Sequence, residues 1–496
     1  MSDLLQECDL LVVGGGINGT GIARDAAGQG LSVLLVEQDD LASHTSSSST
    51  KLIHGGLRYL EYYEFSLVRK ALAEREVLLA AAPHIMWPLR FVLPHEPHLR
   101  PAWMIRAGLF LYDHLARRRR LPASEAVDLQ RHEAGAPLRT DHRRGFVYSD
   151  VWVDDARLVV LNALDARERG ARILTRTRCT AITREDGTWT AALASASGEQ
   201  RVRARAVVNA AGPWVGRFLD QSTPVRSRNS VRLVKGSHII VPRLFEHPYA
   251  YIFQNVDRRI IFAIPYEHDF TLIGTTDVEY HGDAAQTAID ADEVAYLCEL
   301  ATRYFRHNVS PTEVIWSYSG VRPLLEDESS DPSSVTRDYS FELDTAGAPL
   351  LSVFGGKITT YRRLAEDALA RLLPALGVQH RSWTASAPLP GGEMPGGDYA
   401  RFRATLATTY PGFAPRLLDR WARTYGARLP RWLGAAAAPS DLGAEVAEGL
   451  HEAELRYLNE QEWARTADDV LWRRTKLGLH LPPDAAAAVG AWLAAL

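Results

Sequence analysis

The chain of 496 residues has few cysteines, few lysines and no long apolar run, and the first and last of these shortages each exclude a class of protein. Its cysteines, Cys8, Cys179 and Cys298, form neither a CxxC pair nor a disulfide framework, which favours a reducing compartment. The N-terminal residues lack the basic start and apolar core of a signal peptide. Because no run reaches the ~18 apolar residues of a spanning helix, we expect a cytoplasmic protein that meets a membrane only at its surface.

The remaining composition is that of a large globular protein. Hydrophobic residues make up 46% of the chain and charged residues 23%, which excludes wholesale disorder. The net charge of -4 weighs against a nucleic-acid partner, although arginines gather between residues 100 and 144. We expect no metal site, because His95 and His98 lie in a proline-rich loop without a cluster of carboxylates.

A strand, a glycine-rich turn, a helix and a second strand follow one another at the N-terminus. Residues 10–13 form the short apolar run of a buried parallel strand. Gly14, Gly16 and Gly19 then fit G-x-G-x-x-G. The second strand stops at Glu37, about 20 residues further on, where a carboxylate hydrogen-bonds a ribose. The pattern predicts a helix N-terminus that faces a pyrophosphate, and the acid favours FAD or NAD over NADP.

Two further segments favour FAD over NAD. The hydroxyl-rich run 45–50 precedes the glycine pair at 55–56, a combination that suits close backbone approach to a second large flat group. Late in the chain, residues 351–362 again predict a strand, a glycine turn and a helix. Residues 207–214 give a third strand followed by glycine. We therefore expect one cofactor domain assembled from distant segments.

Together these motifs resemble the FAD-dependent, quinone-linked (aerobic) glycerol-3-phosphate dehydrogenases. The resemblance rests on GGGINGTGIARDAAGQG, SSTKLIHGGLRYLE, VVNAAGPW, VKGSHIIVP, IGTTDVEY, YSGVRPL and FGGKITTYRRLA, and it extends to ADDVLWRRTKLGL near the C-terminus. Gln29 departs from the family, which has arginine at this helix end. The resemblance implies an α/β fold with an FAD-binding Rossmann-like domain of the D-amino-acid-oxidase or glutathione-reductase type. It also implies an inserted antiparallel-sheet substrate domain and a C-terminal helical cap domain.

The expected domains follow from these motifs. Alternating β-rich runs and turns between 231 and 277 predict the substrate sheet, and the pattern after 387 is helical. The FAD-binding segments are 1–75, 146–220 and 336–386, the membrane-facing part of the substrate domain is 76–145, the substrate-binding segment is 221–335, and the C-terminal helical domain is 387–496.

The resemblance implies that a hydride passes from C2 of sn-glycerol 3-phosphate to N5 of a non-covalent FAD, which yields dihydroxyacetone phosphate. Such a reaction needs a base for the hydroxyl proton and a cationic grip on the phosphate. We expect His238 to be the base, because a neutral imidazole accepts a proton at cellular pH, with Arg322 polarising the C2 oxygen. His54 is the alternative base.

By resemblance, the other site residues fall within the shared motifs. The expected substrate contacts are Arg58, Tyr59, Arg337, Lys357 and Thr359. The expected cofactor-binding residues are Gly14, Gly16, Asn18, Gly19, Glu37, Ser47, Ser48, Lys51, His54, Gly55, Ala211, Gly212, Trp214, Gly355, Gly356 and Thr360.

The segment 99–113 predicts an apolar helix that carries Trp103, Phe110 and Tyr112 and is followed by four arginines at 117–120. It is too short to span a membrane but suits a helix in the interface, with arginines on anionic headgroups. A buried helix with a solvated basic loop is the alternative. With the family resemblance, this segment favours peripheral attachment to the inner face of the cell membrane. The expected partners are glycerol 3-phosphate, a membrane quinone and anionic lipid, and a homodimer stays open.

Two other functions stay open. A soluble oxidase of the same fold would give electrons to oxygen and act on glycerol 3-phosphate, an amine or a 2-hydroxy acid. A flavin-bearing nucleic-acid binder would use the basic segment 100–144. The cations Arg58, Arg322 and Lys357 favour a phosphate over a lone carboxylate. Oxygen consumption by lipid-free protein would separate the oxidase from the dehydrogenase.

Overall fold

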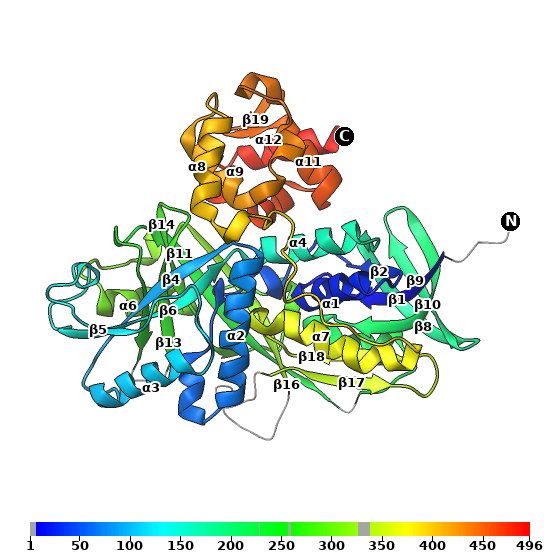
Figure 1. The fold of residues 1–496 in the computed structure, drawn as a ribbon, viewed down its shortest axis with the longest axis horizontal. Coiled ribbons are helices and arrows are strands. Elements are labelled where there is room, and N and C mark those ends of the chain that lie inside the picture. The colour runs from blue at the N-terminus through cyan, green and yellow to red at the C-terminus, as the bar shows by residue number, and fades with distance from the viewer. Residues whose placement is uncertain (1–5, 228, 256–258, 326–337) are drawn as a thin grey trace.

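The computed structural model describes residues 6–227, 229–255, 259–325 and 338–496. Two large sheets lie side by side, each with helices packed on it, and a mainly helical C-terminal domain lies across one side of both (Figure 1). Within these residues, none of the helices has both the length and the apolar character needed to cross a bilayer.

The first sheet has a parallel centre. Strand β1 pairs in parallel with β10 and β2, β10 with β18, and β2 with β7. All residues of β2 and β18 are buried, as expected of strands that are covered on both faces. The path through the sheet is β17 (Ser340–Asp344), β18 (Leu350–Phe354), β10 (Gly198–Asn209), β1 (Gln6–Val13), β2 (Val33–Val36) and β7 (Arg172–Leu174), and β8 (Thr177–Glu185) and β9 (Thr188–Ser195) extend it from β10.

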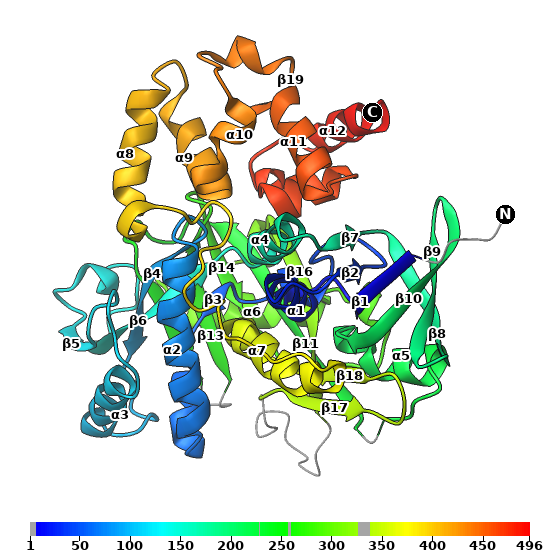
Figure 2. The same cartoon turned by 45° about the vertical axis from the view of Figure 1, so that its right-hand side comes forward.

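Helices cover both faces of this sheet. On one face, α1 (Ile17–Gly28), α4 (Asp155–Glu168) and α7 (Tyr361–Leu372) share a core with β1 and β2. Figure 2 shows α1 between α4 and α7. On the other face, α5 (Val215–Ser222) packs with β8 and β9. Helix α1 is therefore buried along its length, and its N-terminal end is fixed where β1 ends.

The second sheet is mainly antiparallel. Helices α2 (Phe65–Ala81) and α3 (Ala102–His114) pack on one face, and α6 (Ala291–Tyr304) packs on the other. The strands expected between 237 and 274 are present as β11 to β14. The sheet consists of β3 (Leu52–Ile53), β4 (Met86–Pro94), β5 (Glu125–Asp128), β6 (Arg144–Val153), β11 (Val231–Pro242), β12 (Ala250–Gln254), β13 (Ile260–Tyr266), β14 (Phe270–Gly274), β15 (Val278–Glu279) and β16 (Trp316–Leu325).

Two strands lie in the second sheet although they fall within segments expected to bind cofactor. Strand β3 pairs with β6, and β6 pairs with β4 from Met86↔Val153 to Pro94↔Gly145. The chain therefore enters the second sheet just after residue 51 and returns toward the first sheet at residue 154. The expected domain boundaries near 75 and 145 stay predictions. Strands β3 and β6 lie in the second sheet although these boundaries assign them to the FAD-binding segments.

The C-terminal domain has a core of its own, made of residues between Leu406 and Leu493. One of its contacts with the rest of the molecule is made by a π-helical segment, η12 (Asp469–Arg474), whose Arg473 pairs with Asp40. Its other elements are α8 (Tyr399–Thr409), α9 (Pro415–Tyr425), α10 (Pro430–Leu433), β19 (Glu445–Ala447), β20 (Leu450–His451), α11 (Glu452–Glu462) and α12 (Ala485–Ala494).

The third glycine of the N-terminal turn has a packing role that one substitution tests. A Cβ atom on Gly19 would lie 1.9 Å from the carbonyl oxygen of Gly14, so Gly19→Ala forces α1 away from β1. We expect this variant to lose about 1–3 kcal/mol of stability and to show a lower thermal midpoint.

Gly216→Ala in α5 is the matched control. No heavy atom lies within 4 Å of its added Cβ, and alanine favours a helix over glycine. A Gly19→Ala protein with the same thermal midpoint as the Gly216→Ala control would contradict the packing role.

Candidate functional site

A groove of about 330 Å³ lies where β1, β2 and β10 of the first sheet end. Residues from four distant segments meet in its wall, namely 13–18, 36–46, 210–222 and 355–356. Several expected cofactor residues line it: Gly14, Gly16, Asn18, Glu37, Ala211, Gly212, Trp214, Gly355 and Gly356. Convergence of these segments is what a discontinuous dinucleotide site requires.

The glycine turn leaves no room for side chains. At Gly14, φ is +113°, and a Cβ would lie 2.4 Å from the carbonyl oxygen of Ala210. Gly16 is the N-cap of α1 and provides no side-chain cap, although the backbone N–H of Ile17 donates to Ser46 Oγ at 3.0 Å. The N-terminal end of α1 at the groove is thus suited to an anionic pyrophosphate.

Asn18 joins the first turn of the fold to the last. Its Nδ2 donates to the carbonyl oxygen of Gly355 at 3.1 Å. Its Oδ1 is buried and accepts no hydrogen bond within the described residues. At Gly356, where φ is +99°, a Cβ would lie 2.7 Å from the side chain of Leu364. A buried amide oxygen without a donor, beside glycines that keep the wall open, fits a site that FAD completes.

Glu37 lies at the end of β2 in the groove wall. Its Oε2 accepts from the backbone N–H of Gly15 at 2.6 Å, and its Oε1 accepts from that of Asp39 at 2.8 Å. Burial raises the pKa of its carboxyl, and the two backbone donors oppose this shift. Since each carboxylate oxygen has a second lone pair, Glu37 keeps the capacity for the expected ribose hydrogen bond.

Other expected cofactor residues hold the loop beside the groove and are absent from its lining. The ammonium of Lys51 is buried, lies 2.9 Å from Asp155 Oδ1 and donates to the carbonyl oxygen of Ser47 at 3.0 Å. The hydroxyls of Ser47 and Ser48 both donate to the carbonyl oxygen of His44. These side chains therefore shape the loop from inside.

His54, Gly55 and Thr360 lie at the junction between the two sheets and α7. The backbone N–H of His54 donates to Thr359 Oγ1 at 3.2 Å. That of Gly55 donates to the hydroxyl of Tyr112 at 2.9 Å. Thr360, the N-cap of α7, is buried. The segments expected on either side of the flavin are thus hydrogen-bonded to each other.

His238 is buried in β11, with 1% of its surface exposed. Its ring stacks on Tyr318 at 4.7 Å, and its Nε2 lies 3.0 Å from Thr50 Oγ1. Its Nδ1 is buried and has no hydrogen-bond partner within the described residues. Burial, reinforced by Arg322 and Lys51, lowers the pKa of His238 well below 6.5. The imidazole is therefore neutral at physiological pH, as a general base must be.

Arg322 lies on β16, next to β11. Its Nη1 pairs with Asp277, and its Nη2 lies 3.3 Å from Thr275 Oγ1. A Cβ on Gly236 would lie 2.6 Å from this Nη2 and 2.7 Å from Thr275 Oγ1, so a side chain there would displace these groups. The guanidinium is thus half-buried and fixed in one orientation near His238.

Two of the expected substrate residues, Lys357 and Tyr59, lie in contact. The ammonium of Lys357 lies 3.9 Å from the ring centroid of Tyr59, which joins segments almost 300 residues apart. Arg58 donates to the hydroxyl of Tyr62 at 3.2 Å. Thr359 is buried against His54. Arg337 lies outside the described residues.

Sequence reasoning missed part of the groove wall. The residues of the hydroxyl-rich run that line it are Thr45 and Ser46, preceded by Ser43 and His44, rather than Ser47 and Ser48. The His44 ring lies 4.7 Å from that of Trp214. Composition indicated the loop, but the 3₁₀ turn Thr45–Ser47 decides which hydroxyls face the groove. Thr177, Cys179 and Arg217 also line it, and no motif marks them.

The depressed pKa of His238 predicts a pH-dependent stability. Below pH 6.5 the unfolded chain binds a proton at this residue that the folded protein does not bind. His238 therefore lowers the free energy of unfolding by up to about 1.4 kcal/mol for each pH unit below 6.5, and has no such effect above pH 6.5. We expect His238→Gln to have a lower thermal midpoint than wild type at about pH 7.5. This difference should be smaller at pH 5.5, which is about one pH unit below the usual pKa of histidine. An equal gap at both pH values would contradict a neutral His238.

Comparison with known proteins agrees with this geometry. Residues 9–362 match the family described as FAD dependent oxidoreductase, and residues 382–495 match the C-terminal domain of alpha-glycerophosphate oxidase. A glycerol-3-phosphate dehydrogenase from Pseudomonas aeruginosa is 56% identical over 493 residues, which are 99% of this chain and 96% of that protein. A D-erythritol 1-phosphate dehydrogenase from Brucella abortus is 54% identical over 490 residues, 98% of each.

A solved structure supports the same assignment. The glycerol-3-phosphate dehydrogenase from Bacillus halodurans, complexed with FAD, superposes with a TM-score of 0.79 at 28% identity, covering 99% of this chain and 91% of that one. The expected fold class and the FAD cofactor are confirmed. The chain therefore belongs to the FAD-dependent oxidoreductase family, and it joins that fold to the C-terminal domain of the alpha-glycerophosphate oxidases.

Proposed function

We propose that the protein oxidises sn-glycerol 3-phosphate to dihydroxyacetone phosphate. The observation that carries this proposal is the buried, neutral His238 next to the half-buried Arg322, in a chain that is 56% identical to a glycerol-3-phosphate dehydrogenase over nearly its whole length. When bound, FAD supplies the acceptor for the hydride of the alcohol carbon. The residues of the chain supply the remaining tasks.

His238 takes the hydroxyl proton in this proposal. We assign the ring hydrogen to Nε2, which then donates to Thr50 Oγ1 at 3.0 Å, because this tautomer leaves the lone pair of Nδ1 for the substrate proton. Nδ1, which bonds to no described residue, is then the atom that accepts the proton. Arg322 stabilises the negative charge that develops on the substrate oxygen.

The phosphate dianion is bound by cations from different segments. Lys357 follows the glycine pair after β18, and Arg58 follows the glycine pair after β3. A dianion held by several cations orients the reacting carbon, so binding energy far from the reaction is used to align it. The relative named for D-erythritol 1-phosphate makes a longer polyol phosphate the second candidate substrate.

The decisive measurement is the flavin absorbance of purified protein without oxygen. We expect glycerol 3-phosphate to bleach it. Lys357→Ala should keep its flavin but raise KM about 30-fold, since one charge-assisted hydrogen bond contributes about 2 kcal/mol. Lys70→Ala is the control, because Lys70 is a surface lysine with 45% of its side chain exposed.

Each outcome has a separate meaning. Colourless protein would refute the cofactor site, and yellow protein that glycerol 3-phosphate does not bleach would refute the substrate. Faster bleaching by D-erythritol 1-phosphate would favour the second candidate. Loss of flavin from Lys357→Ala would make Lys357 a cofactor ligand.

We further propose that the electrons pass to a quinone and that the protein attaches to the inner face of the cell membrane. Support comes from an exposed aromatic surface, defined as Tyr62, Tyr63, Phe65, Trp103 and Phe110, with exposed fractions between 39% and 80%. Figures 1 and 2 both place α3 beside the N-terminal end of α2, which brings these segments together. Such a surface suits the membrane interface.

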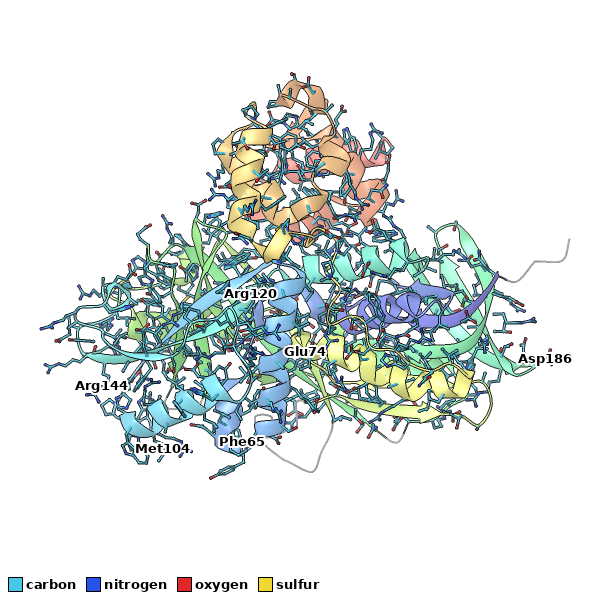
Figure 3. All side chains as sticks on the ribbon, viewed as in Figure 1. Phe65, Glu74, Met104, Arg120, Arg144 and Asp186 are labelled. Carbon is cyan, nitrogen blue, oxygen red and sulfur yellow. The ribbon has the colours of Figure 1, made fainter. Side chains whose placement is uncertain are left out.

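Two arginines of the run at 117–120 are hydrogen-bonded within the protein. Arg118 donates to the carbonyl oxygen of Asp113, and Arg120 donates to that of Gly396 at 3.0 Å. Figure 3 shows Phe65 and Met104 at the lower edge of the molecule and Arg120 well above them. Two other arginines lie at or near the aromatic surface: Arg58 donates to the hydroxyl of Tyr62 at 3.2 Å, and Arg100 lies 3.1 Å from Glu61.

Vesicle binding tests the attachment. Tyr63→Ser/Trp103→Ser should bind anionic vesicles about 30-fold more weakly, since two partly inserted aromatic rings contribute about 2 kcal/mol. Arg117→Ser/Arg119→Ser is the control and should bind like wild type. If only the arginine variant is released from the vesicles, the arginine run at 117–120 and not the aromatic surface anchors the protein. If wild type itself does not bind and consumes oxygen, the soluble oxidase is the better assignment.

A further inference from the structure

The C-terminal domain contacts the cofactor half of the molecule through a buried ionic cluster. Arg474, with 0% of its side chain exposed, holds both carboxylate oxygens of Asp40, each at 2.8 Å. Arg473 donates from Nε to the same carboxylate at 2.7 Å. Asp40 itself is 2% exposed. Two cations from η12 therefore fix one carboxylate that lies more than 400 residues earlier in the chain.

Asp40 opens the loop that forms one wall of the groove, residues 40–51, here called the cofactor loop. The carbonyl oxygen of Asp40 accepts from the backbone N–H of Ser43 at 3.2 Å and from its hydroxyl at 2.5 Å. Residues 42–46 then line the groove. Ala42 has a positive φ of 61°. The orientation of Asp40 therefore sets the path by which the chain enters the groove wall.

The far end of the cofactor loop is held from the same side. Asp155 accepts from the backbone N–H and the hydroxyl of Ser49, and its Oδ1 lies 2.9 Å from the ammonium of Lys51. Its neighbour Asp154 lies 3.4 Å from the ammonium of Lys476, just after η12. One short C-terminal segment thus contacts the start of the loop directly and its end through α4.

Charge makes this arrangement hard to replace. Without Arg473 and Arg474, the Asp40 carboxylate would be a buried anion with no cation, a state that a protein avoids by turning the group out to water. Turning Asp40 outward would move the residues that follow it, including Ser46, whose hydroxyl accepts from the backbone of α1. The groove wall is thus coupled to the ionic cluster.

We infer that the C-terminal domain is part of the cofactor site, with Arg473 and Arg474 acting as positioning residues that hold the cofactor loop in its FAD-binding path. This inference rests on the FAD site described above and assigns the C-terminal domain a role in retaining FAD.

The test is release of FAD from the holoenzyme after dilution, followed by flavin fluorescence. Asp40→Asn keeps the shape of the side chain but removes its charge, and Arg474→Lys keeps the charge but removes the two-pronged contact. If either change lowers the population of the binding-competent loop to about a tenth, the apparent Kd for FAD rises about tenfold. The Kd for FAD of the double variant should be no higher than that of the more affected single variant, because both changes break the same contact.

Arg428→Lys is the matched control. Arg428 is also a buried arginine that joins the C-terminal domain to α4, through Glu168 at 2.7 Å, but it does not contact the cofactor loop. It should lower the thermal midpoint yet keep the Kd for FAD within about twofold of wild type. Faster hydrogen exchange in residues 40–51 of Asp40→Asn, and not of Arg428→Lys, would locate the effect in the loop.

Two results would overturn the inference: Asp40→Asn and Arg474→Lys that retain FAD like wild type, or Arg428→Lys that loses it equally. Wild-type protein that binds no FAD would instead overturn the cofactor site itself. Wild-type protein that holds FAD but ignores glycerol 3-phosphate would overturn only the proposed substrate, so the failures are distinguishable.

Discussion

The contact on which the site depends is that of backbone against backbone at the glycine turn. Gly19 lies so close to the carbonyl oxygen of Gly14, and Gly14 so close to that of Ala210, that no Cβ fits at either glycine. This packing brings the ends of β1 and β10 and the start of α1 to one point, and Asn18 adds the turn after β18. These backbone contacts alone bring together the segments that form the groove.

The walls of the groove are held differently, by buried charges. Lys51 pairs with Asp155 and Arg474 with Asp40, and each side chain in these pairs is less than 5% exposed. Such pairs add little net stability compared with apolar packing, but breaking one is costly, so they select a single arrangement of the loops they join. A cofactor site assembled from distant segments needs that selectivity more than it needs extra stability.

The elements were predictable because hydrophobic pattern and glycine spacing report them directly. The sequence indicated the turn at Gly14, strands β11 to β14 of the second sheet and the helix after Gly356. It did not indicate that Lys51 is buried against Asp155, because that partner lies 104 residues away and no local pattern marks it. The same reason explains the arginine run. Its composition suggests a membrane face, but the partners of Arg120 are carbonyl oxygens in the linker to the C-terminal domain.

Electrostatics around His238 link binding to proton transfer under the proposed function. Arg322 and Lys51 both lower the pKa of His238, so a proton on its ring is disfavoured while the site holds only these cations. A phosphate dianion bound nearby would oppose their field and raise the pKa of the imidazole. His238 would then become a stronger base once substrate is present, and a weak one without it. The charge of the bound substrate would therefore also time the proton transfer, and a neutral substrate of similar shape would lack this effect.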